Sequence, residues 1–162
     1  MQVLQYMKAH MGEFDPTNLI DQYFQKQAKQ NNEKVDGLET LSFQANLLYG
    51  TPLKRQIEQL DCFLNNLDYY AQLTERMAKA YYAQDLKGLL DVMNEKFNTT
   101  CDDTPDETAK LIDNRNVDWA SRMPAIMKTA PTLFVVGAGH LPGDKGVLKL
   151  LQNKGYTVEA VK

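Results

Sequence analysis

The sequence predicts a helix-rich α/β fold with a small, mainly parallel sheet near the C-terminus. Two observations lead to this prediction. Between Ser42 and Phe97, apolar residues recur at three- and four-residue steps, the period of amphipathic helices. Residues 132–161 then read as strand, glycine turn, helix and strand, the order of a β-α-β unit. The chain of 162 residues shows no repeat or linker, so it is predicted to form a single domain.

The N-terminal third is predicted to hold two helices and one short strand. Residues 3–14 place apolar side chains along one helical face, and a second helix begins with Asp15 or Thr17 as its N-cap. Residues 35–38 indicate a brief strand bounded by polar residues. This strand would carry Glu39 at its end.

The later elements are predicted from caps and breaks. Thr51 is expected as the N-cap of a helix, and residues 104–107 have the sequence of a capped helix start. Pro124 is expected to kink or shorten the helix in which it lies. The two strands of the β-α-β unit are predicted at 133–136 and 157–161.

Composition excludes several classes of protein. The formal net charge is -3 and the pI is near 5.4, which gives no electrostatic support for nucleic-acid binding. No apolar run approaches the roughly 18 residues of a membrane span, and no leader resembling a signal peptide precedes Asp15. Cys62 and Cys101 are expected as two separate buried apolar side chains, with one disulfide as the alternative.

The glycine turn partly matches a dinucleotide-binding fingerprint. Gly137 and Gly139 fit its first two glycines, and Glu159 lies near the distance expected of a ribose ligand. However, the third glycine, Gly143, comes one residue late, and Pro142 stands where the helix should already run. A nucleotide-binding β-α-β module is therefore only a remote alternative.

A structural explanation of these glycines is also open. Gly137 and Gly139 would release the chain from the strand at positive φ, and Gly155 would end the next helix in a left-handed cap. This explanation leaves out His140. The end of a parallel strand is where ligands and catalytic groups collect, so a histidine in the turn suggests a site.

The segment FVVGAGHLPGDKGVLKLLQNKGYTVEAV resembles the C-terminal segment of the TraB/GumN family, which includes the Tiki proteases. VDGLETLSFQ, YYAQDLKGLL and LIDNRNVDWASRM occur upstream in the family's order, so the resemblance covers roughly Leu19 to Lys162. Gly137, Gly139 and His140 fit the family's second GxxH motif. The resemblance implies a metal-dependent hydrolase or peptidase that draws on two GxxH histidines and a glutamate.

Carried onto this chain, the resemblance gives His140 and Glu39 as metal ligands, with manganese, cobalt or zinc as the expected ion. Glu39 is alternatively a general base toward water. Arg115 is expected to hold a substrate carboxylate or an oxyanion, between Asn114 and Asn116 as supporting polar residues. The substrate, a peptide or a small molecule, stays open.

Simpler explanations stand beside these roles. Arg115 would equally form a salt bridge with Asp113, Asp118 or Glu39. Trp119 is expected in the core. A non-catalytic binding or interaction domain on the same scaffold is the alternative function.

One motif of the family is missing. Its first GxxH normally lies in an N-terminal strand, whereas the only other histidine here, His10, lacks the glycine three residues earlier. The chain is therefore expected to be the C-terminal part of a longer domain, inactive alone, and to pair as a homodimer or with the missing segment. The resemblance also favours a bacterial envelope or secreted location, where a bridge between Cys62 and Cys101 would be possible.

Overall fold

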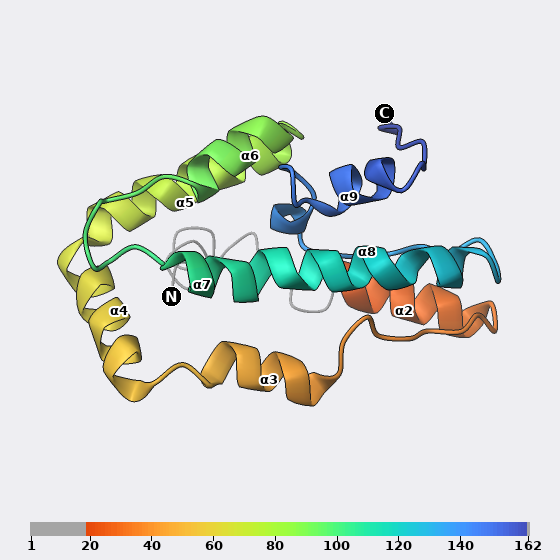
Figure 1. Cartoon of the computed structure of the whole chain (residues 1–162), viewed down its shortest axis with the longest axis horizontal. Helices are drawn as coiled ribbons and strands as arrows, with labels where there is room; N and C mark the ends of the chain where they lie inside the picture. The colour runs from red at the N-terminus through yellow and green to blue at the C-terminus, as the bar shows by residue number, and fades with distance from the viewer. Residues whose placement is uncertain (1–18, 162) are drawn as a thin grey trace. The chain divides into compact units, whose positions relative to one another are not determined.

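The computed structural model describes residues 19–161, and their regular structure is helical (Figure 1). The chain divides into two compact units at Gly50 and Thr51. Residues 1–18 lie outside the described part of the chain. They include the expected helix over residues 3–14, the expected N-cap residues Asp15 and Thr17 of the next helix, and His10.

The first unit contains α2 (Ile20–Gln30) and α3 (Leu41–Tyr49). Thr40 caps α3, because its Oγ1 accepts a hydrogen bond from the Phe43 amide at 3.1 Å. Glu39 lies in the bend that precedes this cap and is half-buried. Its Oε2 accepts a hydrogen bond from Gln44 Nε2 at 3.2 Å. The carboxylate is therefore held at the start of α3, not at the end of a strand.

The second unit begins with three helices. The rest of it contains one further long helix, α8, and several short ones. In chain order, these helices are α4 (Leu53–Asn65), α5 (Leu67–Tyr82), α6 (Leu86–Met93), α7 (Pro105–Thr108), the π-helical turn η1 (Ala109–Asp113), α8 (Asn114–Met127), the 3₁₀ turn η2 (Ala138–His140) and α9 (Val147–Asn153). Figure 1 shows α7 and α8 following one another along a single direction. The helical periodicity of residues 42–97 is thereby confirmed.

The core of this unit lies along α8. Trp119, Ala120 and Met123 are buried on one side of that helix, at spacings of one, three and four residues. Leu89 from α6 and Val147 from α9 are also buried. The loop that carries His140 is thus anchored against the best-packed part of the unit.

Some of the predictions made from local sequence signals are confirmed, and others are wrong. The capped start of α7 is confirmed, because Thr104 Oγ1 accepts from the Glu107 amide and the Glu107 carboxylate accepts from the Thr104 amide. Thr51 is not the N-cap of α4, which begins one residue later than expected, after Pro52. Pro124 does not end α8, since the helix continues to Met127.

The predicted parallel sheet is wrong. Residues 19–161 contain no strand, neither at 35–38 nor at 133–136 and 157–161. A strand needs a partner ladder, and no backbone hydrogen bond joins residues 131–137 to 156–161. Leu133 and Val161 are 66% and 96% exposed, so these apolar runs do not form the buried face of a sheet. The described fold is helical, not α/β.

This correction also removes the β-α-β module on which nucleotide binding depended. Within the described residues, the glycines with positive φ are Gly143 and Gly155, not Gly137 and Gly139. The left-handed cap at Gly155 is confirmed: its amide bonds to Gln152 O, and the Tyr156 amide bonds to Leu151 O. No helix in residues 19–161 is long and apolar enough to cross a membrane.

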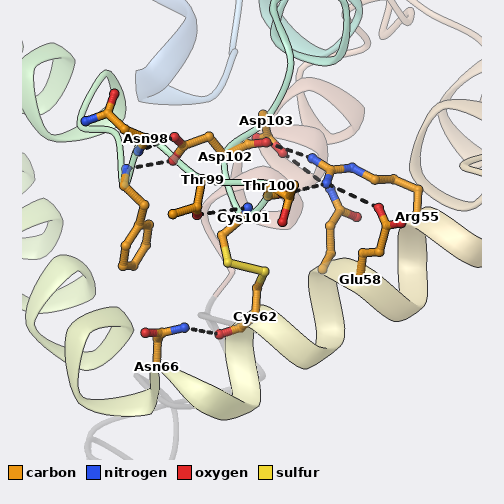
Figure 2. The surroundings of a disulfide bond; sticks show 12 residues. Arg55, Glu58, Cys62, Asn66, Asn98, Thr99, Thr100, Cys101, Asp102 and Asp103 are labelled. Atoms are coloured by element: carbon orange, nitrogen blue, oxygen red, sulfur yellow. Dashed lines mark hydrogen bonds and ion pairs between the residues drawn. A yellow bond between two sulfur atoms is a disulfide. The ribbon is translucent and has the colours of Figure 1, made fainter.

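Cys62 and Cys101 form a disulfide, so the expectation of two separate cysteines is wrong. Figure 2 shows that the bond joins α4 to the loop between α6 and α7. The Arg55 guanidinium holds the same loop: it donates to the Thr100 and Asp102 carbonyls at 2.7 and 2.8 Å, and to both Glu107 carboxylate oxygens at 2.8 and 2.9 Å. We call the disulfide and these Arg55 contacts the loop clamp.

Candidate functional site

His140 is the last residue of η2, and its side chain is buried, with 7% exposed. The turn forms through two backbone hydrogen bonds, from the His140 amide to Gly137 O and from the Leu141 amide to Ala138 O. The imidazole packs on the Trp119 indole from α8, with ring centroids 4.6 Å apart. Trp119 therefore belongs to the core, as expected, and also forms one wall of the site.

Asn116 fixes the orientation of the imidazole. Its Oδ1 lies 2.7 Å from His140 Nδ1, and its Nδ2 donates to the Lys145 carbonyl at 2.8 Å. Because the carbonyl can only accept, it assigns the amide nitrogen to that side and turns Oδ1 toward the ring. His140 Nδ1 must then carry the proton, which leaves the lone pair on Nε2. The Asn116 side chain is fully buried, so water does not compete for these bonds.

Arg115 occupies the other side of the imidazole. Its Nη1 lies 3.2 Å from His140 Nε2 and donates to the Leu111 carbonyl at 3.0 Å. The guanidinium carbon also lies 4.8 Å from the centroid of the Trp119 ring, within cation–π distance. With the lone pair on Nε2, the geometry fits a hydrogen bond from the arginine to the histidine.

The π-helical turn η1 comes directly before these residues. It ends at Asp113, where the Asn114 amide bonds to Ala109 O, five residues back. A single π turn shifts the register of the helix that follows and is frequent at functional sites. Here α8 starts with Asn114, which is exposed, while Arg115 is half-buried and Asn116 is buried.

Glycines shape the loop on both sides of His140. A Cβ at Gly146 would lie 2.3 Å from both the Leu141 and Pro142 carbonyl oxygens, so only glycine fits there. A Cβ at Gly139 would approach Met93 Sδ at 3.1 Å, and Gly143 has a φ of +87°. Gly137 has a φ of -59° and no such restriction. The loop therefore needs glycine for close packing and one left-handed turn.

Three of the predicted residues come together: His140, Arg115 and Asn116. Asn114 lies exposed at the start of the same helix. Glu39 belongs to the first unit, and its role stays a prediction. Two of the predicted salt-bridge partners of Arg115 pair with other residues: Asp113 with Lys145 at 2.7 Å, and Asp118 with Arg122.

No sequence pattern predicts the backbone groups of this site. The Leu111 and Lys145 carbonyls orient Arg115 and Asn116, yet any residue type supplies a carbonyl. Likewise, the π turn has no recognisable sequence pattern. The part of the site that lies in the main chain could be found only from the structure.

The donor set at this position fits one metal ligand but not a complete centre. Histidines that bind metals usually donate their second ring nitrogen to a neighbouring oxygen, as His140 Nδ1 does to Asn116. A hydrolytic site needs about three protein ligands. Within residues 19–161, no group of three or more His, Cys, Asp or Glu side chains is arranged to hold a metal.

A model of the TraB/PrgY/gumN family matches residues 1–160, nearly the whole chain. No curated protein and no solved structure matches the chain. The match covers both units and includes the segments that carry His140 and Arg115.

Proposed function

The chain belongs to the TraB/PrgY/gumN family, and from this premise we propose that it carries part of a metal-dependent hydrolytic centre. His140 would supply one ligand through Nε2. The observation that carries this proposal is the bond between His140 Nδ1 and Asn116 Oδ1, which is 2.7 Å long and buried. It leaves the neutral imidazole with its lone pair on the nitrogen that a metal would need.

The remaining residues have distinct proposed roles. Asn116 holds the ring and its tautomer, and Arg115 offers a planar charged group for a substrate carboxylate or an oxyanion. Glu39 remains the predicted carboxylate, as a ligand or as a general base. A bound manganese, cobalt or zinc ion would supply Lewis acidity and a more acidic water. The natural substrate class, peptide or small molecule, is left open.

We further propose that this chain alone is inactive, because one histidine and one carboxylate fall short of the usual number of about three protein ligands. The remaining ligands would come from a second copy or from a segment with the other GxxH motif. Residues 19–161 contain no strand edge that another chain could extend, so the proposed pairing depends on the incomplete ligand set. Light scattering after size-exclusion chromatography tests it, and a monomer at all concentrations would contradict a homodimer.

Calorimetric titration with manganese, cobalt and zinc tests the metal site. The two histidines offer a matched pair of variants: His140→Ala and His10→Ala. We expect weak binding that falls at least tenfold in His140→Ala, the typical effect of disturbing a metal site, and changes little in His10→Ala. Equal binding by the wild type and His140→Ala would remove His140 from the centre. Sub-micromolar binding lost only in His140→Ala would instead contradict the incomplete ligand set.

One observation favours the alternative, a non-catalytic binding domain. Arg115 Nη1 lies 3.2 Å from the nitrogen that a metal would use, so the described site holds a cationic group at that position. In such a domain the guanidinium would stay there and contribute to binding an anionic partner. The same titration separates the two functions, because the binding domain needs no metal at His140.

A further inference from the structure

One nitrogen of Arg115 is shared between two acceptors. Nη1 lies 3.2 Å from His140 Nε2 and 3.0 Å from the Leu111 carbonyl oxygen. The first contact lies at the long end of the ordinary range for an N–H donor, about 2.7–3.2 Å. The guanidinium also lies over the Trp119 ring, 4.8 Å from its centroid. Arg115 therefore has a binding surface next to His140 that does not depend on the imidazole.

His140 Nε2 has one lone pair in the plane of the ring. Asn116 holds the proton on Nδ1, so this lone pair accepts either a hydrogen bond or a metal ion, but not both. A metal ion would lie about 2.0–2.1 Å from the nitrogen, where the Arg115 N–H now points. The positive charge of the guanidinium adds repulsion.

From this geometry we infer that Arg115 and a divalent metal ion bind His140 Nε2 in mutually exclusive states. The inference rests on the proposed function, in which Nε2 is a metal ligand. In the metal-free state Arg115 donates to Nε2. In the loaded state the guanidinium leaves the nitrogen and remains beside the site, over Trp119 and near the Leu111 carbonyl.

This exchange links metal binding to anion binding. Leaving Nε2 frees one N–H of Arg115 for a carboxylate or an oxyanion of the substrate. An anion that binds the freed guanidinium favours the loaded state, and metal loading raises the affinity for that anion by the same factor. Arg115 therefore lowers the affinity of His140 for a metal ion until an anionic ligand is present.

The test measures zinc affinity by calorimetry for the wild type, Arg115→Gln and Arg115→Lys. Removing a charged hydrogen-bond donor from Nε2 should tighten zinc binding about tenfold or more in Arg115→Gln. Arg115→Lys keeps the charge but loses the planar fork and should give a smaller gain. Arg122→Gln is the matched control, since it removes an exposed charge from the same helix, where Arg122 pairs with Asp118. It should leave zinc affinity unchanged.

Acetate serves as the anionic probe in the second arm. Saturating acetate should raise zinc affinity in the wild type and have no effect in Arg115→Gln. Equal zinc affinities of the wild type, Arg115→Gln and Arg115→Lys, together with a loss in His140→Ala, would overturn the exclusion but keep the metal site. Zinc binding that does not depend on His140, or no binding by any variant, would overturn both.

Nitrogen NMR of the imidazole gives a readout besides affinity. The metal-free wild type should show the proton on His140 Nδ1, and adding zinc should shift the Nε2 and Arg115 guanidinium signals together. A zinc-induced shift of Nε2 without any change at Arg115 would also contradict the inference. Circular dichroism of each variant checks that the helices are retained.

Discussion

Two arginines of the second unit, Arg55 and Arg115, both donate side-chain hydrogen bonds, but their contacts have different functions. In the loop clamp, Arg55 is only 16% exposed and donates to a carboxylate and two carbonyls, and a disulfide closes beside it. Arg115 donates through one nitrogen to a carbonyl and an imidazole and lies over an indole. The first set of contacts is strong and fixed, whereas the second includes an acceptor that other ligands can use.

The difference has a physical cause. A bidentate arginine–carboxylate pair is among the strongest hydrogen-bonded contacts in a protein, and the Glu107 partner also caps α7. An imidazole nitrogen is a neutral acceptor and an effective metal ligand. The clamp is therefore expected to contribute stability, and the His140 site to contribute binding. Variants that break one region should leave the other largely intact.

The largest expected effect is loss of the disulfide. Cys62 and Cys101 are 39 residues apart, and closing a loop of that size stabilises the folded state by about 4 kcal/mol through chain entropy. Urea unfolding of Cys62→Ala/Cys101→Ala, and of the wild type with a reductant, should show this decrease. The zinc titration should stay unchanged if the two regions are independent. A loss below about 1 kcal/mol would contradict the role given to the clamp.

The second effect is on the His140 site itself. Asn116→Leu leaves His140 Nδ1 and the Lys145 carbonyl without their partner, and each such buried group costs about 1–3 kcal/mol. We expect a loss of about 3 kcal/mol in urea unfolding and a ring proton that no longer stays on Nδ1. Asn114→Leu is the matched control, because Asn114 is exposed on the same helix. An unchanged tautomer in Asn116→Leu would contradict our assignment.

The third effect depends on pH. The Arg55 guanidinium lowers the pKa of Glu107 from its ordinary value to about 2. A carboxyl group with a lowered folded-state pKa stabilises above its unfolded pKa of about 4.3, and this stabilisation is lost as the pH falls toward about 2. We expect the ionised Glu107 to stabilise the folded state by about 2 kcal/mol near neutral pH. This is less than the full effect of the pKa shift, because the Glu107 side chain is 29% exposed and solvent screens its charge.

Urea unfolding between about pH 6 and pH 2 measures this contribution. Glu107→Gln should be less stable near neutral pH and should lose less stability on acidification. Glu58→Gln is the control, since Glu58 lies 3.7 Å from Arg55 and is 42% exposed, so its ion pair contributes little. Equal acid sensitivity of Glu107→Gln and the wild type would contradict the assignment.

Whether a feature could be predicted from the sequence depends on how far apart in the chain its interacting residues lie. Helical periodicity and the Thr104–Glu107 cap act within a few residues, and both were confirmed. The strands were wrong because a strand depends on a distant partner that local propensity does not report. The disulfide was misjudged for the same reason, since its cysteines meet only through the folded loop.

The candidate site shows the same limit at finer scale. Resemblance to a family pointed to His140, Arg115 and Asn116 because their side chains belong to recognisable motifs. It did not say that Asn116 holds Nδ1 or that Arg115 donates to Nε2, since both depend on the register set by η1. Residue identity was predictable here, whereas hydrogen-bond direction was not.

The smallest effects separate two reasons for glycine near the site. Gly155 has a φ of +90° with open space around it, so Gly155→Ala should cost about 1 kcal/mol through backbone strain alone. Gly137 has a φ of -59°, and an added Cβ would lie 3.7 Å from His140 Cδ2, an ordinary contact. Gly137→Ala should therefore change stability by less than about 0.5 kcal/mol.

Urea unfolding of both variants measures the difference, and a larger loss in Gly137→Ala than in Gly155→Ala would contradict this view of the loop. Zinc titration of Gly137→Ala then adds information that stability does not. If stability is retained but zinc affinity falls, the first glycine of the GxxH motif is needed for the space beside His140 that a ligand occupies. If stability and zinc affinity are both retained, neither the backbone conformation nor metal binding requires glycine at the first position of the motif.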